Sequence, residues 1–242
     1  MTKRRHRYDY LLSALPGLEA LGSVPPMTKQ ELLERVSDAN GPDRTVEVLL
    51  LMDDLIQREA LLAGEIDPDQ ADLAILKVNP ADNEPALPEA LMPEENAEQD
   101  NPRMLVDALW DRYFRWAARV AKRTGSAFLK GWIGFEVGLR NALAQARAQT
   151  LELDATGYLV AQDLADRDLD FGQAVAAWSS ASDPMAAQDA LDKARWAWIE
   201  EHGRWYSFKA DEIEAYAARL VLLHRWRRLQ SERPAAASVG AQ

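Results

Sequence analysis

Hydrophobic residues recur every three or four positions along most of the chain, which is the spacing that lines one face of an α-helix. Helix start signals precede several of these runs, including the capping box Thr28-Lys29-Gln30-Glu31. Glycines that can close a helix follow other runs, at Gly64, Gly125 and Gly203. The pattern predicts helices over residues 28–38, 43–63, 102–123, 126–150, 171–181, 184–202 and 210–231. We therefore expect an all-α protein, an elongated multi-helix bundle.

The predicted helix 102–123 carries apolar residues on two faces. Leu109 and Tyr113 belong to one stripe, whereas Trp110 and Phe114 form a second. A helix with one buried face needs only one such stripe. We therefore expect this helix to lie inside the bundle and to pack on more than one neighbour.

The predicted helix 126–150 contains three glycines within eight positions, Gly131, Gly134 and Gly138. Each glycine costs a helix interior about 1 kcal/mol relative to alanine. A packing contact must offset this cost, and a close helix crossing is the natural one. We therefore predict that another helix crosses this one closely at the glycines.

Acidic residues concentrate in one segment. Residues 65–101 contain eleven acids against a single base, Lys77, and several prolines that interrupt helices. The chain thus divides into an N-terminal helical segment (1–64), an acidic Pro-rich linker or insertion (65–101), a C-terminal helical bundle (102–231) and a disordered tail (232–242). We expect a solvated linker; the alternatives are an acidic arm that docks on a basic partner, or a calcium site at Asp67, Asp69 and Asp72.

Charge and composition exclude several classes of protein. The chain has 242 residues and a net charge of −11, which argues against a nucleic-acid-binding protein because such proteins rely on lysine and arginine. It contains no cysteine, so disulfides, thiolate metal sites and thiol nucleophiles are excluded. No apolar stretch approaches the roughly 20 residues that cross a bilayer. A cytoplasmic protein is the expectation.

Motifs for catalysis are missing from the sequence. The three histidines do not follow the Glu-x-x-His pattern of di-iron bundles, and no Gly-x-x-x-x-Gly-Lys phosphate loop occurs. We predict no catalytic residue, no cofactor and no metal site. The alternative is a magnesium-dependent helical enzyme that uses Asp53 and Asp54, because Asp53 and Gln57 stand one helical turn apart. The favoured interpretation of these residues is a solvated helix face.

Cations and tryptophans cluster in the last two predicted helices. Arg195 precedes Trp196 and Trp198, as in some single-strand binders, but the spacing of Leu191 and Trp198 favours use in the core. The final helix ends in a basic patch, which either complements the helix dipole or docks on a partner. The predicted partner interface consists of Arg225, Trp226, Arg227 and Arg228.

Three stretches resemble known proteins. They are Tyr8-x-Tyr10-Leu11-Leu12-x-x-Leu15-Pro16; Phe128-Leu129-x-x-Trp132-x-x-Phe135-Glu136-x-x-Leu139-Arg140-Asn141, followed by Arg147-Ala148; and the run from Asp189 to Trp226. Together they resemble a bacterial family of C-like proteins encoded among V-type ATPase subunits. The second stretch is also similar to the larger C component of the central stalk, called d in eukaryotes. The acidic segment has no counterpart in that family.

The resemblance implies a non-catalytic part of the central stalk, which belongs to the rotor. Such a part is all-α and has the helical funnel shape of the C family. It lies on the cytoplasmic side of the membrane rotor ring and binds the central shaft. It couples ATP hydrolysis to ion transport, is present in one copy per complex, and contacts the membrane only through that complex. The alternative is a cytosolic all-α adaptor of another assembly.

Overall fold

The computed structural model describes residues 8–79, 84–93 and 102–231. These residues form eight α-helices: α1 (Asp9–Ala14), α2 (Lys29–Asp38), α3 (Asp43–Ala63), α4 (Pro102–Thr124), α5 (Ala127–Thr150), α6 (Gly172–Ser179), α7 (Pro184–His202) and α8 (Ala210–Ser231). Three short 3-10 helices, η1 (Glu89–Leu91), η2 (Thr156–Tyr158) and η3 (Gln162–Leu164), join them. Within these ranges the only extended pairing is one isolated bridge between Val78 and Pro85. The all-α prediction is confirmed.

All seven predicted helices are present, and their ends are close to the predicted ones. The capping box forms as predicted, because Thr28 accepts from the N–H of Glu31 and the Glu31 carboxylate accepts from the N–H of Thr28. The sequence missed α1, a six-residue helix without a capping side chain. This helix depends on tertiary contacts, since Leu11 and the following Leu15 are buried in the core.

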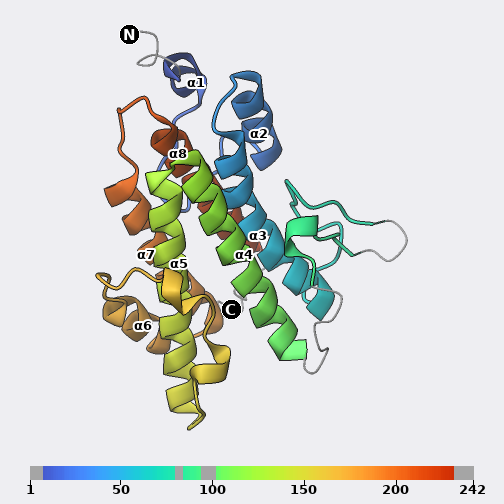
Figure 1. Ribbon diagram of the computed structural model, residues 1–242, viewed down its shortest axis with the longest axis vertical. Helices are drawn as coiled ribbons and strands as arrows, with labels where there is room; N and C mark the ends of the chain where they lie inside the picture. Colours follow the sequence, from blue (N-terminus) through green and yellow to red (C-terminus); the bar gives the residue numbers. More distant parts are fainter. Residues whose placement is uncertain (1–7, 80–83, 94–101, 232–242) are drawn as a thin grey trace, which may run out of the picture.

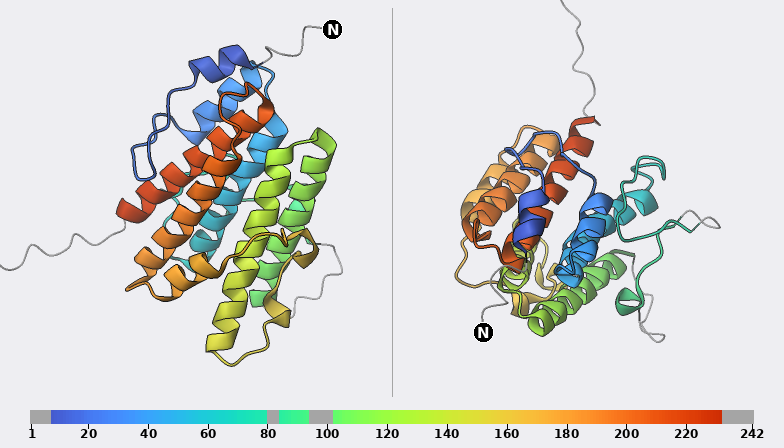
Figure 2. Two further views of the ribbon diagram at one scale, coloured as in Figure 1. Left: turned by 90° about the vertical axis from the view of Figure 1, so that its left-hand side faces the viewer. Right: turned by 90° about the horizontal axis from the view of Figure 1, so that it is seen from above.

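The long helices pack side by side as a bundle (Figure 1). α3 packs on α8, α4 on α5, and α7 on α8, while α6 packs on α7. The view from above in Figure 2 shows α4 and α5 on one side of α3 and α8. α2 packs on α3 and α8. None of the helices in the described ranges combines the length and apolarity that a membrane span requires.

The two apolar stripes of α4 are both buried, as predicted. Leu109, Trp110, Tyr113 and Phe114 are each at most 5% exposed. The Tyr113 hydroxyl donates to the carbonyl of Val48 at 2.9 Å, which ties α4 to α3. α4 therefore packs on α5 with one part of its surface and on α3 with another.

The glycines of α5 accommodate side chains and a loop. A Cβ at Gly131 would lie 3.1 Å from the Trp198 ring, and one at Gly138 would lie 2.5 Å from the Phe171 ring. At Gly134 it would lie 3.2 Å from Asp166 in the loop after η3. The prediction of a close helix crossing at the glycines is therefore wrong. Aromatic rings and a loop occupy the space that the glycines leave.

Parts of the acidic segment are folded against the bundle within its described residues, 65–79 and 84–93, whereas residues 67–70 are exposed. Leu76 and Leu91 are buried in the core. Arg58 of α3 donates to the carbonyl of Pro85 at 2.9 Å, and Arg112 of α4 donates to that of Leu91 at 3.0 Å. The prediction of a solvated linker is wrong here, because prolines prevent helix formation without preventing burial. Residues 80–83 and 94–101 of this segment, and the tail 232–242, lie outside the described residues.

Candidate functional site

The acidic motif of α3 lies inside the protein. Asp53, Asp54 and Gln57 are 1%, 0% and 2% exposed, so the interpretation as a solvated helix face is wrong. α3 lies between α2, α8 and α4, and this surround removes the motif from solvent. The polar side chains must therefore find their partners within the protein.

Asp54 and Gln57 hold the backbone of the acidic segment. The Asp54 carboxylate accepts from the N–H groups of Ala74, Ile75 and Leu76 at 3.0, 2.6 and 2.9 Å. The Gln57 amide donates to the carbonyl of Asp72 at 3.0 Å and accepts from its N–H at 2.8 Å. The motif that suggested a metal site thus binds five groups of the loop backbone.

Asp53 is neutralised by two cations. Lys29, which is fully buried, donates to it at 2.7 Å, and Arg228 donates to both of its oxygens at 2.7 and 3.3 Å. Burial alone would raise the pKa of Asp53, but Lys29 and Arg228 outweigh burial and hold that pKa well below its usual range. Lys29 also donates to the Asp72 carbonyl. These charges join α2, α3, α8 and the acidic segment.

His224 completes this group from α8. Its Nδ1 lies 3.3 Å from the Asp72 carboxylate, and its Nε2 lies 2.9 Å from the carbonyl of Met27. Both neighbours are hydrogen-bond acceptors, so each ring nitrogen of His224 faces an acceptor. We call the following set the Asp53 cluster: Lys29, Asp53, Asp54, Gln57, Asp72, His224 and Arg228.

The geometry of the motif does not fit a magnesium site. Lys29 and Arg228 occupy the positions around the Asp53 carboxylate that a divalent cation would need. Within the described ranges, no group of three or more His, Asp or Glu side chains is placed to hold a metal ion. Asp67 and Asp69, the first two residues of the proposed calcium site, are both exposed, and Asp72 belongs to the Asp53 cluster.

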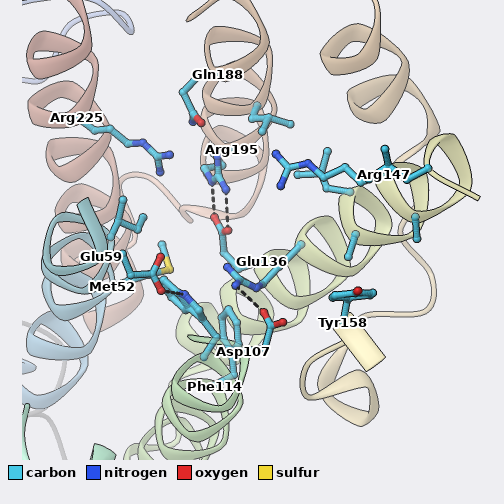
Figure 3. A pocket seen from close by; sticks show the side chains of 18 of the residues that line it. Met52, Glu59, Asp107, Phe114, Glu136, Arg147, Tyr158, Gln188, Arg195 and Arg225 are labelled. Carbon is cyan, nitrogen blue, oxygen red and sulfur yellow. Dashed lines mark hydrogen bonds and ion pairs between the residues drawn. The ribbon is translucent and has the colours of Figure 1, made fainter. Parts of the chain in front are cut away.

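A cleft of about 560 Å³ opens between α3, α4, α5, α7 and α8 (Figure 3). α3 and α4 form one wall, α7 and α8 form another, and α5 runs between them. Apolar side chains make up much of the surface: Met52, Ile56, Trp110, Phe114, Leu143, Leu191 and the exposed Leu151 and Leu153. Its volume falls in the range of small-molecule sites, about 300–1,000 Å³.

Charged side chains form a network along the cleft. Arg195 of α7 binds Glu136 of α5 through two hydrogen bonds at 2.7 and 3.1 Å, and it binds Asp192 at 3.1 Å. Arg225 of α8 reaches the same Asp192 at 3.6 Å. Burial opposes the charge on Arg195, but Glu136 and Asp192 reverse the effect and raise its pKa. We call Glu136, Asp192, Arg195 and Arg225 the cleft network.

Two further arginines line the cleft. Arg140 pairs with Asp107 at 3.3 Å and lies over the Trp110 ring. Arg147 is exposed and stacks on Trp178, with its guanidinium carbon 5.0 Å from the ring centre. The cleft therefore combines apolar walls with four guanidinium groups.

Comparison of the sequence with known families matches the region from α4 to α8 to one family. A family model described as "Protein of unknown function (DUF2764)" matches residues 89–236. The chain belongs to this family. No curated protein and no solved structure matches the chain. The DUF2764 match spans α4 to α8 and contains the whole cleft network, whereas five of the seven residues of the Asp53 cluster precede it.

The predicted partner interface lies within the DUF2764 match but does not form one exposed patch. Arg228 belongs to the Asp53 cluster, and Arg225 belongs to the cleft network. Trp226 is half-buried beside Gly22, whose Cβ position would lie 3.4 Å from the indole nitrogen. Arg227 is the exposed member of the four. A role of these residues in partner binding stays a prediction, and Arg227 is the member best placed for it.

Sequence reasoning missed most of the buried charges. Glu136 stands between Phe135 and Val137 in a helix that is otherwise apolar there, and Lys29 stands in the first turn of α2. A charged residue within an apolar stripe was the available signal, because such a residue is buried with its neighbours and needs a partner. The partner itself, Arg195, lies 59 positions away and carries no local signal. Trp196 and Trp198 are buried, as the spacing predicted.

Proposed function

We propose that this chain is a non-catalytic central-stalk subunit of a bacterial V-type ATPase. In this role it couples the shaft of the ATP-hydrolysing head to the membrane rotor ring, and it lies on the cytoplasmic side of the membrane as a peripheral component. The resemblance of three sequence stretches to the C-like family is the starting point. The arrangement of those stretches in the fold adds support.

The observation that carries the proposal is that the three stretches form one body. The Tyr216 hydroxyl, in the third stretch, donates to the carbonyl of Pro16 in the first at 2.8 Å. Arg195, also in the third, binds Glu136 in the second. Residues that resemble a single family and are scattered over about 200 positions thus hold one another in place.

Buried ion pairs give this body the stiffness that a coupling part needs. The Glu136–Arg195 pair joins α5 to α7, and the Asp53–Arg228 pair joins α3 to α8. Sliding one helix past another would separate buried charges, which costs several kcal/mol for each pair. The bundle therefore resists the twisting of its helices against one another.

The two ends of the bundle expose large apolar side chains. Tyr10 of α1 and Tyr206 of the α7–α8 loop are 86% and 88% exposed, and Leu151 after α5 is 66% exposed. Figure 1 places α1 and the α7–α8 loop at one end of the bundle and the C-terminal end of α5 at the other. Exposed apolar side chains gathered in one region are typical of protein interaction sites. Two such ends fit a part that holds two different partners.

Reconstitution tests the proposal. Purified rotor ring and shaft subunits from the same organism are each titrated with the labelled chain, and saturable binding to both is expected. Tyr206→Ser and Leu151→Ser, on opposite ends, should each weaken binding to one partner by about tenfold, the effect of removing one large apolar contact. Arg227→Glu at low salt tests the predicted basic patch, since exposed charges act most strongly there.

The control is Lys193→Gln, a change of an exposed lysine in the middle of α7, away from both ends, that should alter neither affinity. Absence of saturable binding to both the ring and the shaft would overturn the proposal. That result would favour the adaptor of another assembly.

A further inference from the structure

The cleft contains arginine N–H groups without protein acceptors. Arg225 makes one contact with a carboxylate, at 3.6 Å to Asp192, and no hydrogen bond to any described residue. Arg147 makes neither a hydrogen bond nor an ion pair within the described ranges, and its guanidinium lies over the Trp178 ring. Arg195 uses three of its five N–H groups on Glu136 and Asp192. The cleft thus offers many donors and few acceptors.

These donors face a common space. In Figure 3, the guanidinium groups of Arg225 and Arg147 extend from opposite sides toward Arg195, which is turned toward Glu136, and Gln188 lies close to Arg195. The acids Glu59 and Asp107 lie toward the other end. Glu59 accepts from the Trp110 indole at 2.5 Å, and Asp107 accepts from Arg140. At the positive end, Arg147, Arg195 and Arg225 stand against Glu136 and Asp192, so this end keeps an excess of one positive charge.

Arg225 is the residue that argues most directly for a ligand. Its side chain is only 13% exposed, and it shares Asp192 with Arg195. A buried guanidinium that lacks full pairing is costly, and burial lowers the pKa of Arg225 accordingly. A bound anion would complete its hydrogen bonds, as carboxylate and phosphate groups do with arginine in two-point contacts.

We propose that the cleft binds a small organic anion, with its carboxylate or phosphate group at Arg225, Arg195 and Arg147 and its apolar body against Met52, Phe114 and Leu191. The volume of about 560 Å³ fits a small molecule. This site is independent of the proposed coupling role.

Binding of simple probes to the isolated full chain tests the site. Phenyl phosphate, benzoate and the neutral benzamide are titrated separately, and binding is followed by heteronuclear NMR shifts and by the fluorescence of the tryptophans, of which Trp110 lines the cleft. Phenyl phosphate or benzoate should bind saturably, and benzamide should bind at least about tenfold more weakly because it lacks the charge. Inorganic phosphate, titrated in parallel, measures the contribution of the anion alone.

Two variants locate the binding. Arg147→Gln removes an exposed cation without disturbing an ion pair, and it should weaken binding of the anionic probes by about tenfold, the value of one charge-assisted contact. Ala144→Trp places a large ring in the cleft and should abolish binding. Lys193→Gln, which removes an exposed cation outside the cleft, should have no effect. Circular dichroism and unfolding curves confirm that each variant is folded.

Two results would overturn the site. One is the absence of saturable binding by both anionic probes at millimolar concentration. The other is binding that Arg147→Gln and Ala144→Trp leave unchanged, or that benzamide matches. Because no ring or shaft protein is present, failure here leaves the coupling proposal untouched, and failure of the reconstitution leaves this site untouched.

Discussion

The Asp53 cluster and the cleft network both pair carboxylates with cations between helices, but they differ in how fully the cations are paired. In the Asp53 cluster, Lys29 and Arg228 each lie 2.7 Å from the Asp53 carboxylate, and the Gln57 amide donates to it at 2.9 Å. In the cleft network, Arg225 reaches its acid only at 3.6 Å and faces open space. A closed set of charges fixes parts of the chain to one another, whereas an open set keeps donors available.

The family match follows the same division. The cleft network lies entirely inside residues 89–236, and the Asp53 cluster ties the segments that precede this region onto α8. The Asp53 cluster therefore acts as an anchor for α2, α3 and the acidic segment. This comparison gives three predictions about stability. They differ in how many contacts the replaced side chain makes within its set.

The largest effect is expected from Lys29→Met. This change leaves Asp53 and Asp54 buried with Arg228 as the remaining cation, and breaking a buried pair on one side costs about 3–5 kcal/mol. Urea unfolding followed by tryptophan fluorescence measures the loss in the free energy of unfolding. The matched control is Lys130→Met, at an exposed position of α5, which should change stability by less than about 0.5 kcal/mol. A loss below about 1 kcal/mol for Lys29→Met would mean that the cluster is not a closed anchor.

A paired comparison on α8 should give an intermediate effect. Arg228→Met removes a two-point contact with Asp53 and should cost about 2 kcal/mol, the value of hydrogen bonds to a charged group. Arg225→Met, one turn earlier, removes only the weak contact with Asp192 and should cost less than about 1 kcal/mol. The same unfolding measurement serves both variants. Equal losses would erase the distinction between the closed and the open set.

The helices were predictable from sequence because their signals are local. The capping box at Thr28 and the two stripes of α4 fix their elements within a few residues of chain, and both are present in the structure. α1 was missed because its stability comes from Leu11, which packs on distant parts of the chain. Propensity over six residues could not show this.

The candidate sites were not predictable in the same way. Asp53 and Asp54 were correctly placed on one helix, but their partners come from α2, α8 and a loop that the prolines seemed to exclude from the core. The cleft depends on five helices at once. Local periodicity identifies which residues share a helix face, and it does not identify which helix that face meets.

The smallest effect is expected from Asp72→Asn and depends on pH. The hydrogen bond from His224 lowers the pKa of Asp72 below its ordinary value of 3.8, and Lys29 adds to this against the effect of burial. The folded state therefore favours the ionised carboxyl, and its contribution to stability is present above pH 3.8 and is lost as the pH falls through the lowered pKa. The side chain is 44% exposed, so solvent screening limits the contribution to less than about 1 kcal/mol.

Unfolding curves from about pH 7 down to well below pH 3.8 should thus show wild type and Asp72→Asn differing most at neutral pH and converging as the pH falls through the lowered pKa, where the wild-type carboxyl is protonated as well. Asp69→Asn, an exposed change three residues earlier, should follow the wild-type curve throughout. A difference for Asp72→Asn that stays constant from neutral to acid pH would assign its effect to lost packing, and the acidic segment would then be held by its backbone contacts with Asp54 and Gln57 instead of by the charge of Asp72.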